Sequence, residues 1–341
     1  MKVLNELSVK DLKLNKKRSI VIIIGIILST ALICGVAGLV TSFQKTFVET
    51  AKKNQGNYHT IFYDVPKDEL KYIEENRGVK EYYLSEGIGY SYLPNVTVTT
   101  STGAEEKPYV NIIAMDNKFL NNMSIELQNG RLPESDDEIV VSARINQKFK
   151  TNYKVGDTIT LNVGELKDDT SDVDEKNSQS SENEIINTTP KTYKIVGIIN
   201  RPTTTIEPYE AEWFTVITKM QTIKKQANIA VLYTNPYDYK KNTEYINKMV
   251  EVKVGENVDK SEVTTFNGLD KFYRSYKYKI KINNELLSYE GASLDDETLK
   301  TIYGLGAFIM GIVLVSSVFV IRNGFAISIT ERLKQYGMLS S

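Results

Sequence analysis

Two long apolar runs constrain this chain more than any other feature of its sequence. They extend from Ile20 to Val40 and from Ile302 to Ile321, and neither contains a charged residue. At the 1.5 Å rise per residue of an α-helix, about 20 residues cross a hydrocarbon core roughly 30 Å thick. The sequence therefore predicts two transmembrane helices, residues 20–40 and 302–321, with residues 41–301 forming a domain between them.

The charges beside these runs predict the orientation of the chain. Residues 16–18 (KKR) directly precede the first run, and Arg322, Arg332 and Lys334 follow the second. Lys and Arg are enriched on the cytoplasmic side of membrane helices. We therefore expect a multi-pass protein of the cell membrane with both termini in the cytoplasm and the central domain outside. Residues 1–19, in which leucines lie among lysines, are typical of a short amphipathic segment on the membrane surface.

A cleaved signal peptide is an alternative interpretation of the first run. The apolar part of a signal peptide spans about 7–15 residues, and this run is longer. A lipoprotein cleavage site before Cys34 would need a small preceding residue, and Ile33 is large. An uncleaved membrane helix is the favoured interpretation.

The scarcity of cysteine and histidine limits the chemistry open to the chain. Cys34 and His59 are the single residues of their kinds, so an intramolecular disulfide is impossible and a zinc site built from Cys and His is not expected. A Ser-His-Asp triad would have to use His59, and a lone histidine is more often structural than catalytic. The net charge of −1 creates no field that would attract nucleic acid. We predict no catalytic residues, no cofactor and no metal, and hence a protein that is not an enzyme.

Alternating strand and helix patterns predict an α+β fold for the central domain. The first membrane helix is expected to continue as a stalk through Asn54 and to end at Gly56. The expected helices are residues 68–78, 116–123, 143–149 (capped by Ser142) and 238–250. The expected strands are residues 59–65, a pair within 79–93, 108–116, 138–142, 158–163, 193–199 (with a bulge at Gly197), 212–218 and 229–234. Residues 271–287 are expected to form a return stalk, with a strand as the alternative.

An acidic, Ser- and Asn-rich segment interrupts the domain at about residues 164–190. It has too few large apolar residues to offset the entropy lost on ordering, so we expect a disordered insertion between two strands. A calcium site formed by Asp168, Asp169, Asp172 and Asp174 is the alternative. The segment lacks the Gly and the terminal Glu of an EF-hand loop, which favours a solvated loop.

Several short motifs occur in a fixed order along the chain. Gly130, Arg131, Leu132 and Pro133 form a turn that breaks the chain before a strand. DEIVVS (137–142), KVGDTITL (154–161) and YKIVGII (193–199) follow, and ISITERLKQYGML (327–339) comes after the second apolar run. In this order, between two membrane helices, the motifs resemble the MacB/FtsX-like ABC transporter permeases with their MacB-like extracytoplasmic core domain. Such permeases carry at least two further membrane helices after this tail, so the resemblance implies the N-terminal part of a permease.

The tail after the second membrane helix, residues 322–341, carries an apolar stripe. Phe325, Ile329, Leu333 and Tyr336 recur at helical spacing, Glu331 and Arg332 lie off the stripe, and Gly337 can end or bend the helix. From the residues alone, such a helix either lies on lipid or docks into a partner. The resemblance implies docking, as a coupling helix that binds a cytoplasmic ABC ATPase. It also implies a homodimer, or a pseudo-dimer with another permease half.

Two functional hypotheses follow. In the first, the chain is a permease subunit that transmits ATP-driven movement to its outer domain. The subunit would serve to export peptides, lipids or lipoproteins, to sense them or to confer resistance to them. The ATPase must be a separate chain, because the nearest phosphate-loop pattern, Gly255–Ser261 (GENVDKS), lacks the Gly before Lys. The alternative is a two-helix membrane receptor with an outer sensing domain. A receptor would need a signalling coiled coil or a kinase domain after the second helix, and the tail shows no sustained heptads.

Overall fold

The computed structural model describes residues 16–99, 103, 105–167, 184–251, 278–293 and 297–339. The chain divides into two compact units. Residues up to Phe47 and from Leu294 onward form the helix unit, and Val48–Ser293 form the domain. Helix α2 (Lys16–Gln55) leaves the first unit and ends in the second, and α9 (Glu297–Leu339) lies in the helix unit.

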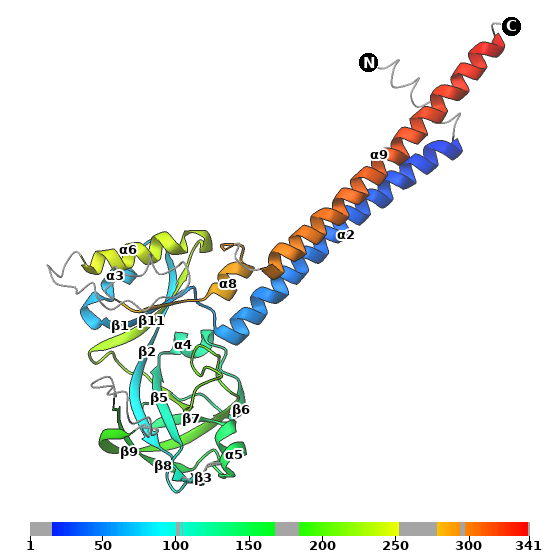
Figure 1. The fold of residues 1–341 in the computed structure, drawn as a ribbon. Helices are drawn as coiled ribbons and strands as arrows, with labels where there is room; N and C mark the ends of the chain where they lie inside the picture. Colours follow the sequence, from blue (N-terminus) through cyan, green and yellow to red (C-terminus); the bar gives the residue numbers. More distant parts are fainter. Residues whose placement is uncertain are drawn as a thin grey trace, which may run out of the picture. The chain divides into compact units, whose positions relative to one another are not determined.

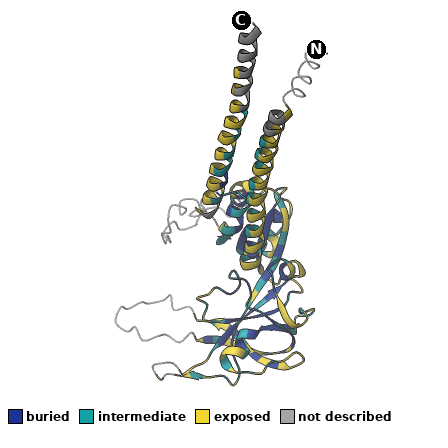
Figure 2. Ribbon diagram, turned by 90° about the vertical axis from the view of Figure 1, so that its right-hand side faces the viewer, coloured by how far each residue is buried: buried dark blue, intermediate teal, exposed yellow. Residues whose placement is uncertain are grey.

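The helix unit consists of two long antiparallel helices (Figure 1). A Cβ atom added to Gly25 would lie 2.8 Å from Cγ1 of Val320, and one added to Gly306 would lie 2.9 Å from Cγ2 of Val40. These glycines therefore allow α2 and α9 to approach closely at two levels. Ile23–Gln55 and Lys300–Asn323 are long and apolar enough to cross a membrane. Most of their side chains are exposed, as the yellow colour of both helices shows (Figure 2).

One mixed sheet organises the domain. Its order is β12-β1-β11-β2-β5-β10-β7-β9-β6, with β8 pairing to both β2 and β9. The pairs β5/β10 and β7/β9 are parallel, and the other pairs are antiparallel. The strands are β1 (Thr60–Pro66), β2 (Val79–Tyr92), β5 (Tyr109–Met115), β6 (Leu127–Gly130), β7 (Glu138–Ser142), β8 (Thr158–Leu166), β9 (Ile185–Ile199), β10 (Phe214–Lys219), β11 (Gln226–Tyr233) and β12 (Ile280–Ile282).

Short helices cover and connect this sheet. They are η1 (Lys67–Glu69), α3 (Lys71–Glu74), α4 (Asn117–Asn122), α5 (Ala143–Phe149), η2 (Pro236–Asp238), α6 (Tyr239–Glu251) and α8 (Asn284–Tyr289), and a small hairpin pairs β3 (Val98–Thr99) with β4 (Glu105–Glu106). The predicted α+β class is confirmed. The predicted bounds of β7 and α5 are confirmed too, and the Ser142 hydroxyl accepts a hydrogen bond from the Arg144 N–H at 3.4 Å.

The bulge predicted at Gly197 is also present. Between the β7 residues Ile139 and Val140, the partner on β9 advances from Ile195 to Gly197, so Val196 is the extra residue. A Cβ at Gly197 would collide with the carbonyl oxygen of Arg131. Glycine is required here because the turn before β7 comes very close to β9.

Three predictions about the domain are corrected. The stretch 79–93 contains one long strand, Val79–Tyr92, rather than a pair, because a bulge between Gly87 and Gly89 bends β2 without ending it. The described part of the predicted return stalk is β12 and α8, because Ile280–Ile282 pairs with β1 over a buried apolar cluster. The predicted insertion is shorter than 164–190, since β8 extends to Leu166 and pairs there with Ile185, which is buried. Residues 168–183, with the four aspartates of the calcium alternative, lie outside the described residues.

The tail also differs from its prediction. Helix α9 is continuous from Glu297 to Leu339, so it does not end at Gly337 and no separate tail helix follows the membrane segment. A single glycine inside a helix costs about 1 kcal/mol relative to alanine, which neighbouring helix-forming residues can offset.

Candidate functional site

The predicted partner-binding residues all belong to the last part of α9. Phe325, Ile329, Leu333 and Tyr336 occupy one face of the helical backbone by their spacing, and Glu331, Arg332 and Gly337 belong to the same turns. The structure describes the helical backbone here but not the positions of these side chains. The proposed docking role therefore stays a prediction.

The turn Gly130–Pro133 forms a buttressed corner between β6 and β7. Gly130 has a φ of +81°, and a Cβ there would collide with the carbonyl oxygen of Val196. The Arg131 guanidinium donates to both carboxylate oxygens of Glu138, at 2.7 and 2.5 Å. This bidentate pair, with help from the Glu134 N–H, lowers the pKa of Glu138 to about 2. Leu132 packs on a buried core cluster, so this corner is structural.

A second corner is built around a buried carboxylate. Glu207 is fully buried and pairs with the guanidinium of Arg144 on α5 and, at 3.4 Å, with Arg201. Its other oxygen accepts from the Thr215 N–H at 3.0 Å, at the start of β10. The Arg-Glu-Arg triad thereby fixes the loop before β10 against the sheet.

The site with the clearest functional geometry lies where the chain enters and leaves the domain. Gly56 ends α2 with a φ of +106°, and its carbonyl accepts from the Asn283 side chain at 3.1 Å. The Asn283 N–H in turn donates to the carbonyl of His59 at 2.9 Å. The side-chain amide of Gln55, the residue before Gly56, donates to Glu285 of α8 at 3.3 Å. We call these contacts, together with the pair His59–Glu290, the junction.

His59 is the centre of the junction. Its side chain is almost fully buried, and Nδ1 lies 3.0 Å from the backbone N of Tyr233. A backbone N–H can only donate, so Nδ1 is the acceptor and the proton of a neutral ring is on Nε2. Nε2 then donates to the Glu290 carboxylate at 2.8 Å. The lone histidine is a structural link between β1, β11 and the C-terminal end of α8.

The partners of His59 could not be found from sequence. Glu290 lies 231 positions away along the chain, and Asn283 and Glu285 belong to a segment expected to be a stalk. The one sequence feature that pointed to this site was that His59 is the single histidine of the chain. Among the described residues, no group of three His, Cys, Asp or Glu side chains is arranged to hold a metal ion.

Comparison with known proteins adds a family. Residues 19–264 match the MacB-like periplasmic core domain. No curated protein matches the chain. Among solved structures, the chain is similar to the extracellular domain of the noncanonic ABC-type transporter YknZ from Gram-positive bacteria, at 10% identity and a TM-score of 0.36, over 59% of this chain and 96% of that one. The family match covers well over half of this sequence, from the start of the first membrane helix into the last part of the domain, and the protein therefore belongs to the MacB-like family of ABC transporter permeases.

Proposed function

We propose that this permease transmits the movement of a separate cytoplasmic ATPase to its extracytoplasmic domain. The observation that carries the proposal is the junction. The junction ties the end of α2, where the chain enters the domain, to α8, where the chain leaves it. A displacement of either segment is therefore shared with the other segment and with the sheet. Permeases of this family are components of ABC transporters, which use ATP hydrolysis in another subunit.

The junction is suited to transmit force because its groups are buried and directional. His59 bonds to β11 through Tyr233 and to α8 through Glu290, while Leu286 and Leu287 of α8 are fully buried. Helix α2 is continuous for 40 residues up to Gln55. A helix held by its own backbone hydrogen bonds changes length little, so a push on α2 reaches Gly56 and then β1.

At the other end, the cytoplasmic contact is proposed to be the α9 stripe. Both termini would be cytoplasmic, with the domain outside and a second permease copy or half completing the transporter. Labelling intact cells with an impermeant thiol reagent tests this topology. Gln147→Cys, on the exposed side of α5, should react and Ser340→Cys should not, in a Cys34→Ser background.

The ATPase contact is tested by Leu333→Asp in the full-length permease. An aspartate forced into an apolar groove loses the packing contact and leaves a charge unpaired, so the ATPase should no longer co-purify. Glu331→Ala, off the stripe, should keep most of the association. Undiminished co-purification of Leu333→Asp would mean that the stripe lies on lipid, and the two-helix receptor would then be the better interpretation.

The junction is tested by a matched pair at Glu290. Glu290→Ala removes the acceptor of the His59 Nε2–H, whereas Glu290→Gln keeps an acceptor oxygen there. Both variants should still bind the ATPase. We expect the ATP-dependent signal of a fluorophore on Gln147→Cys to be lost with Ala and kept with Gln, and a full signal from the Ala variant would contradict the role of the junction.

The transported or sensed molecule is proposed to be a peptide, lipid or lipoprotein, as the family resemblance implies. Reconstituting the full-length permease with its ATPase in vesicles would test each class by ATP-dependent movement across the bilayer. If none of the three classes moved across the bilayer in an ATP-dependent way or stimulated ATP hydrolysis, this part of the proposal would be wrong.

A further inference from the structure

A cavity of about 720 Å³ lies on one face of the domain sheet. Its floor comes from neighbouring strands, with Tyr63 on β1, Gly87 on β2, Ile113 on β5 and Asn228 on β11. Phe119 of α4 and Glu165 of β8 also line it. The volume falls in the range of about 300–1,000 Å³ that is typical of small-molecule sites in proteins.

Three irregularities of the sheet meet at this cavity. In β1 the pairing with β11 shifts between Phe62 and Val65, and Asp64 has a φ of +55°. The second shift lies between Gly87 and Gly89 in β2, and the third lies between Val163 and Glu165 in β8. Bulges re-aim side chains and are enriched next to functional sites. Here they accompany three lining residues: Tyr63, Ile88 and Glu165.

The charge of the cavity wall is negative. Among the lining residues that the structure describes, Glu165 is the one carboxylate, and none is Lys, Arg or His. Asp64 lies beside Tyr63, and burial together with this carboxylate raises the pKa of the Tyr63 hydroxyl, which therefore stays neutral. The nearby Lys167 is paired with Glu184 at 3.2 Å, so its charge is compensated.

The remaining lining groups are neutral and of two kinds. Some lining side chains are apolar or aromatic, and others carry amides or hydroxyls, namely Ser85, Asn111, Asn228 and Thr205. Tyrosine and phenylalanine faces attract organic cations through the ring quadrupole. An anion would meet the Glu165 carboxylate, with no positively charged partner among the described lining residues.

We propose that this cavity binds a monovalent organic cation with an apolar body. The cationic end would lie toward Glu165, and the apolar body would contact Ile113, Phe119 and the rings of Tyr63 and Tyr90. This inference does not depend on ATPase coupling, because binding is measured on the permease alone. Failure of one proposal therefore leaves the other standing.

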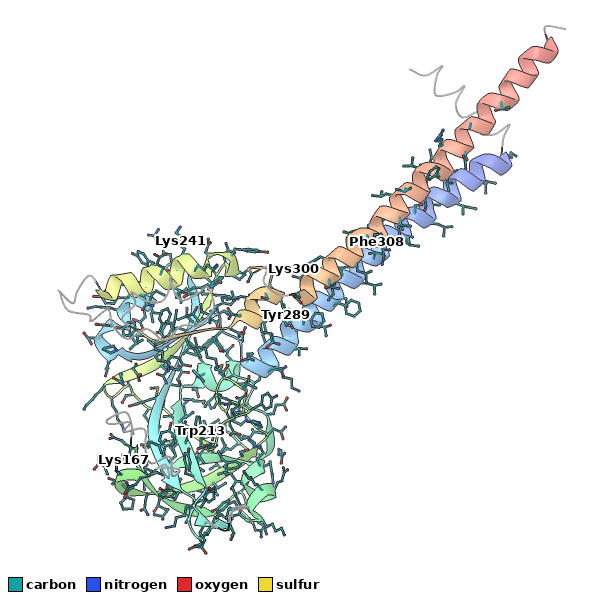
Figure 3. All side chains as sticks on the ribbon, in the orientation of Figure 1. Lys167, Trp213, Lys241, Tyr289, Lys300 and Phe308 are labelled. Carbon is teal, nitrogen blue, oxygen red and sulfur yellow. The ribbon has the colours of Figure 1, made fainter. Side chains whose placement is uncertain are left out.

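The chain carries its own reporter for this binding. Trp213 is its single tryptophan and makes an edge contact with Tyr90, with ring centroids 6.3 Å apart (Figure 3 labels Trp213). Tyr90 also lines the cavity. A ligand that moves Tyr90 should change the Trp213 fluorescence.

The test uses two probes of the same shape and opposite charge, tetraphenylphosphonium and tetraphenylborate. Each is titrated into the full chain in phosphatidylcholine nanodiscs while Trp213 fluorescence is recorded. We expect a saturable change with the cation and an affinity at least about tenfold lower for the anion. Equal affinities for the two probes would overturn the inference.

Two substitutions place the binding in the cavity. Gly87 is exposed, lines the cavity and has no atom within 4 Å of an added Cβ, so Gly87→Phe should fill the space without distorting β2. Gly87→Phe should weaken cation binding by about tenfold or more, and Gly87→Ala should change it little. Glu165→Gln, on an exposed side chain, should weaken the binding of the cation by roughly three- to tenfold and should not weaken the binding of the anion, because the repelling carboxylate is gone. Unchanged cation affinity in Gly87→Phe or in Glu165→Gln would contradict the site.

Discussion

The helix unit and the domain use the same apolar residue types in opposite ways. Ile312 and Leu314 of α9 expose 52% and 55% of their surface, whereas Ile112 and Ile217 of the sheet are fully buried. Apolar surface exposed to water on this scale would be unstable in a soluble protein. The difference shows that each region is matched to its own solvent, lipid for the helices and water for the domain.

The hydrogen bonds of polar side chains also differ between the two regions. In the helix unit, Ser29 and Ser317 donate to carbonyls of their own helix four residues earlier, at 2.8 and 2.7 Å. In the domain, Glu207 and His59 bond to segments far away in sequence. Within a bilayer a polar group must be satisfied locally. In the domain, the same groups hold distant segments together.

The largest effect is expected from Glu207→Gln. The substitution leaves Arg144 and Arg201 without their shared carboxylate next to the sheet, and the free energy of unfolding of the domain should fall by about 4 kcal/mol. Urea titration of residues 48–293 measures it. Glu210→Gln, at an exposed neighbouring position, is the control and should stay within about 0.5 kcal/mol. A small loss for Glu207→Gln would mean that water replaces the carboxylate at this corner.

The same substitution in both regions tests their difference directly. Ile217→Ala removes buried methyl groups and should destabilise the domain by about 3 kcal/mol. Ile312→Ala in the full chain should leave the unfolding of the domain unchanged, because its side chain faces outward from α9. Thermal unfolding followed by Trp213 fluorescence gives both values. Equal losses would show that α9 side chains support the domain core.

An intermediate effect is expected from Gly306→Leu. The added side chain would clash with Val40, so α2 and α9 should separate, whereas Gly304→Leu points into open space. The readout is disulfide cross-linking between Gly25→Cys and Val320→Cys in a Cys34→Ser background. We expect the yield to fall several-fold only for Gly306→Leu. Equal cross-linking yields for Gly306→Leu and Gly304→Leu would show that the glycine at position 306 is not needed for the close approach of α2 and α9.

The smallest effect concerns pH. The folded-state pKa of Glu138, about 2, lies below its unfolded value, so its contribution is present above about pH 4.5 and is lost as the pH falls toward 2. Because the Arg131 side chain is about half exposed, solvent screens the pair, and this contribution should stay below about 1 kcal/mol. The acid-dependent loss should therefore be smaller in Arg131→Gln than in the unchanged protein. Parallel stability profiles between pH 5 and 2 would contradict the role of the pair.

Local patterns predicted a large part of this fold. The strand Glu138–Ser142 and the helix after it were predicted residue by residue, because a capping serine and an uninterrupted apolar run leave few alternatives. The length of β2 could not be predicted in the same way. Its Gly-Ile-Gly sequence is compatible with a turn, and only pairing with β5 and β11 makes it one bulged strand.

The sites show the same division. The α9 stripe was predicted from helical spacing alone, and its role in docking stays a prediction. Glu290 could not be paired with His59, and Glu165 could not be assigned to the same cavity as Tyr63, since the residues of each pair are far apart in the chain.

The sequence by itself determined the two membrane helices and the α+β class of the region between them, since both follow from the solvent that each local pattern requires. Only the tertiary structure decided that residues 280–290 return to β1, because that choice depends on which distant strand edge and apolar surface are free. The cavity and the junction are products of this long-range pairing, which joins segments that carry no local sign of one another.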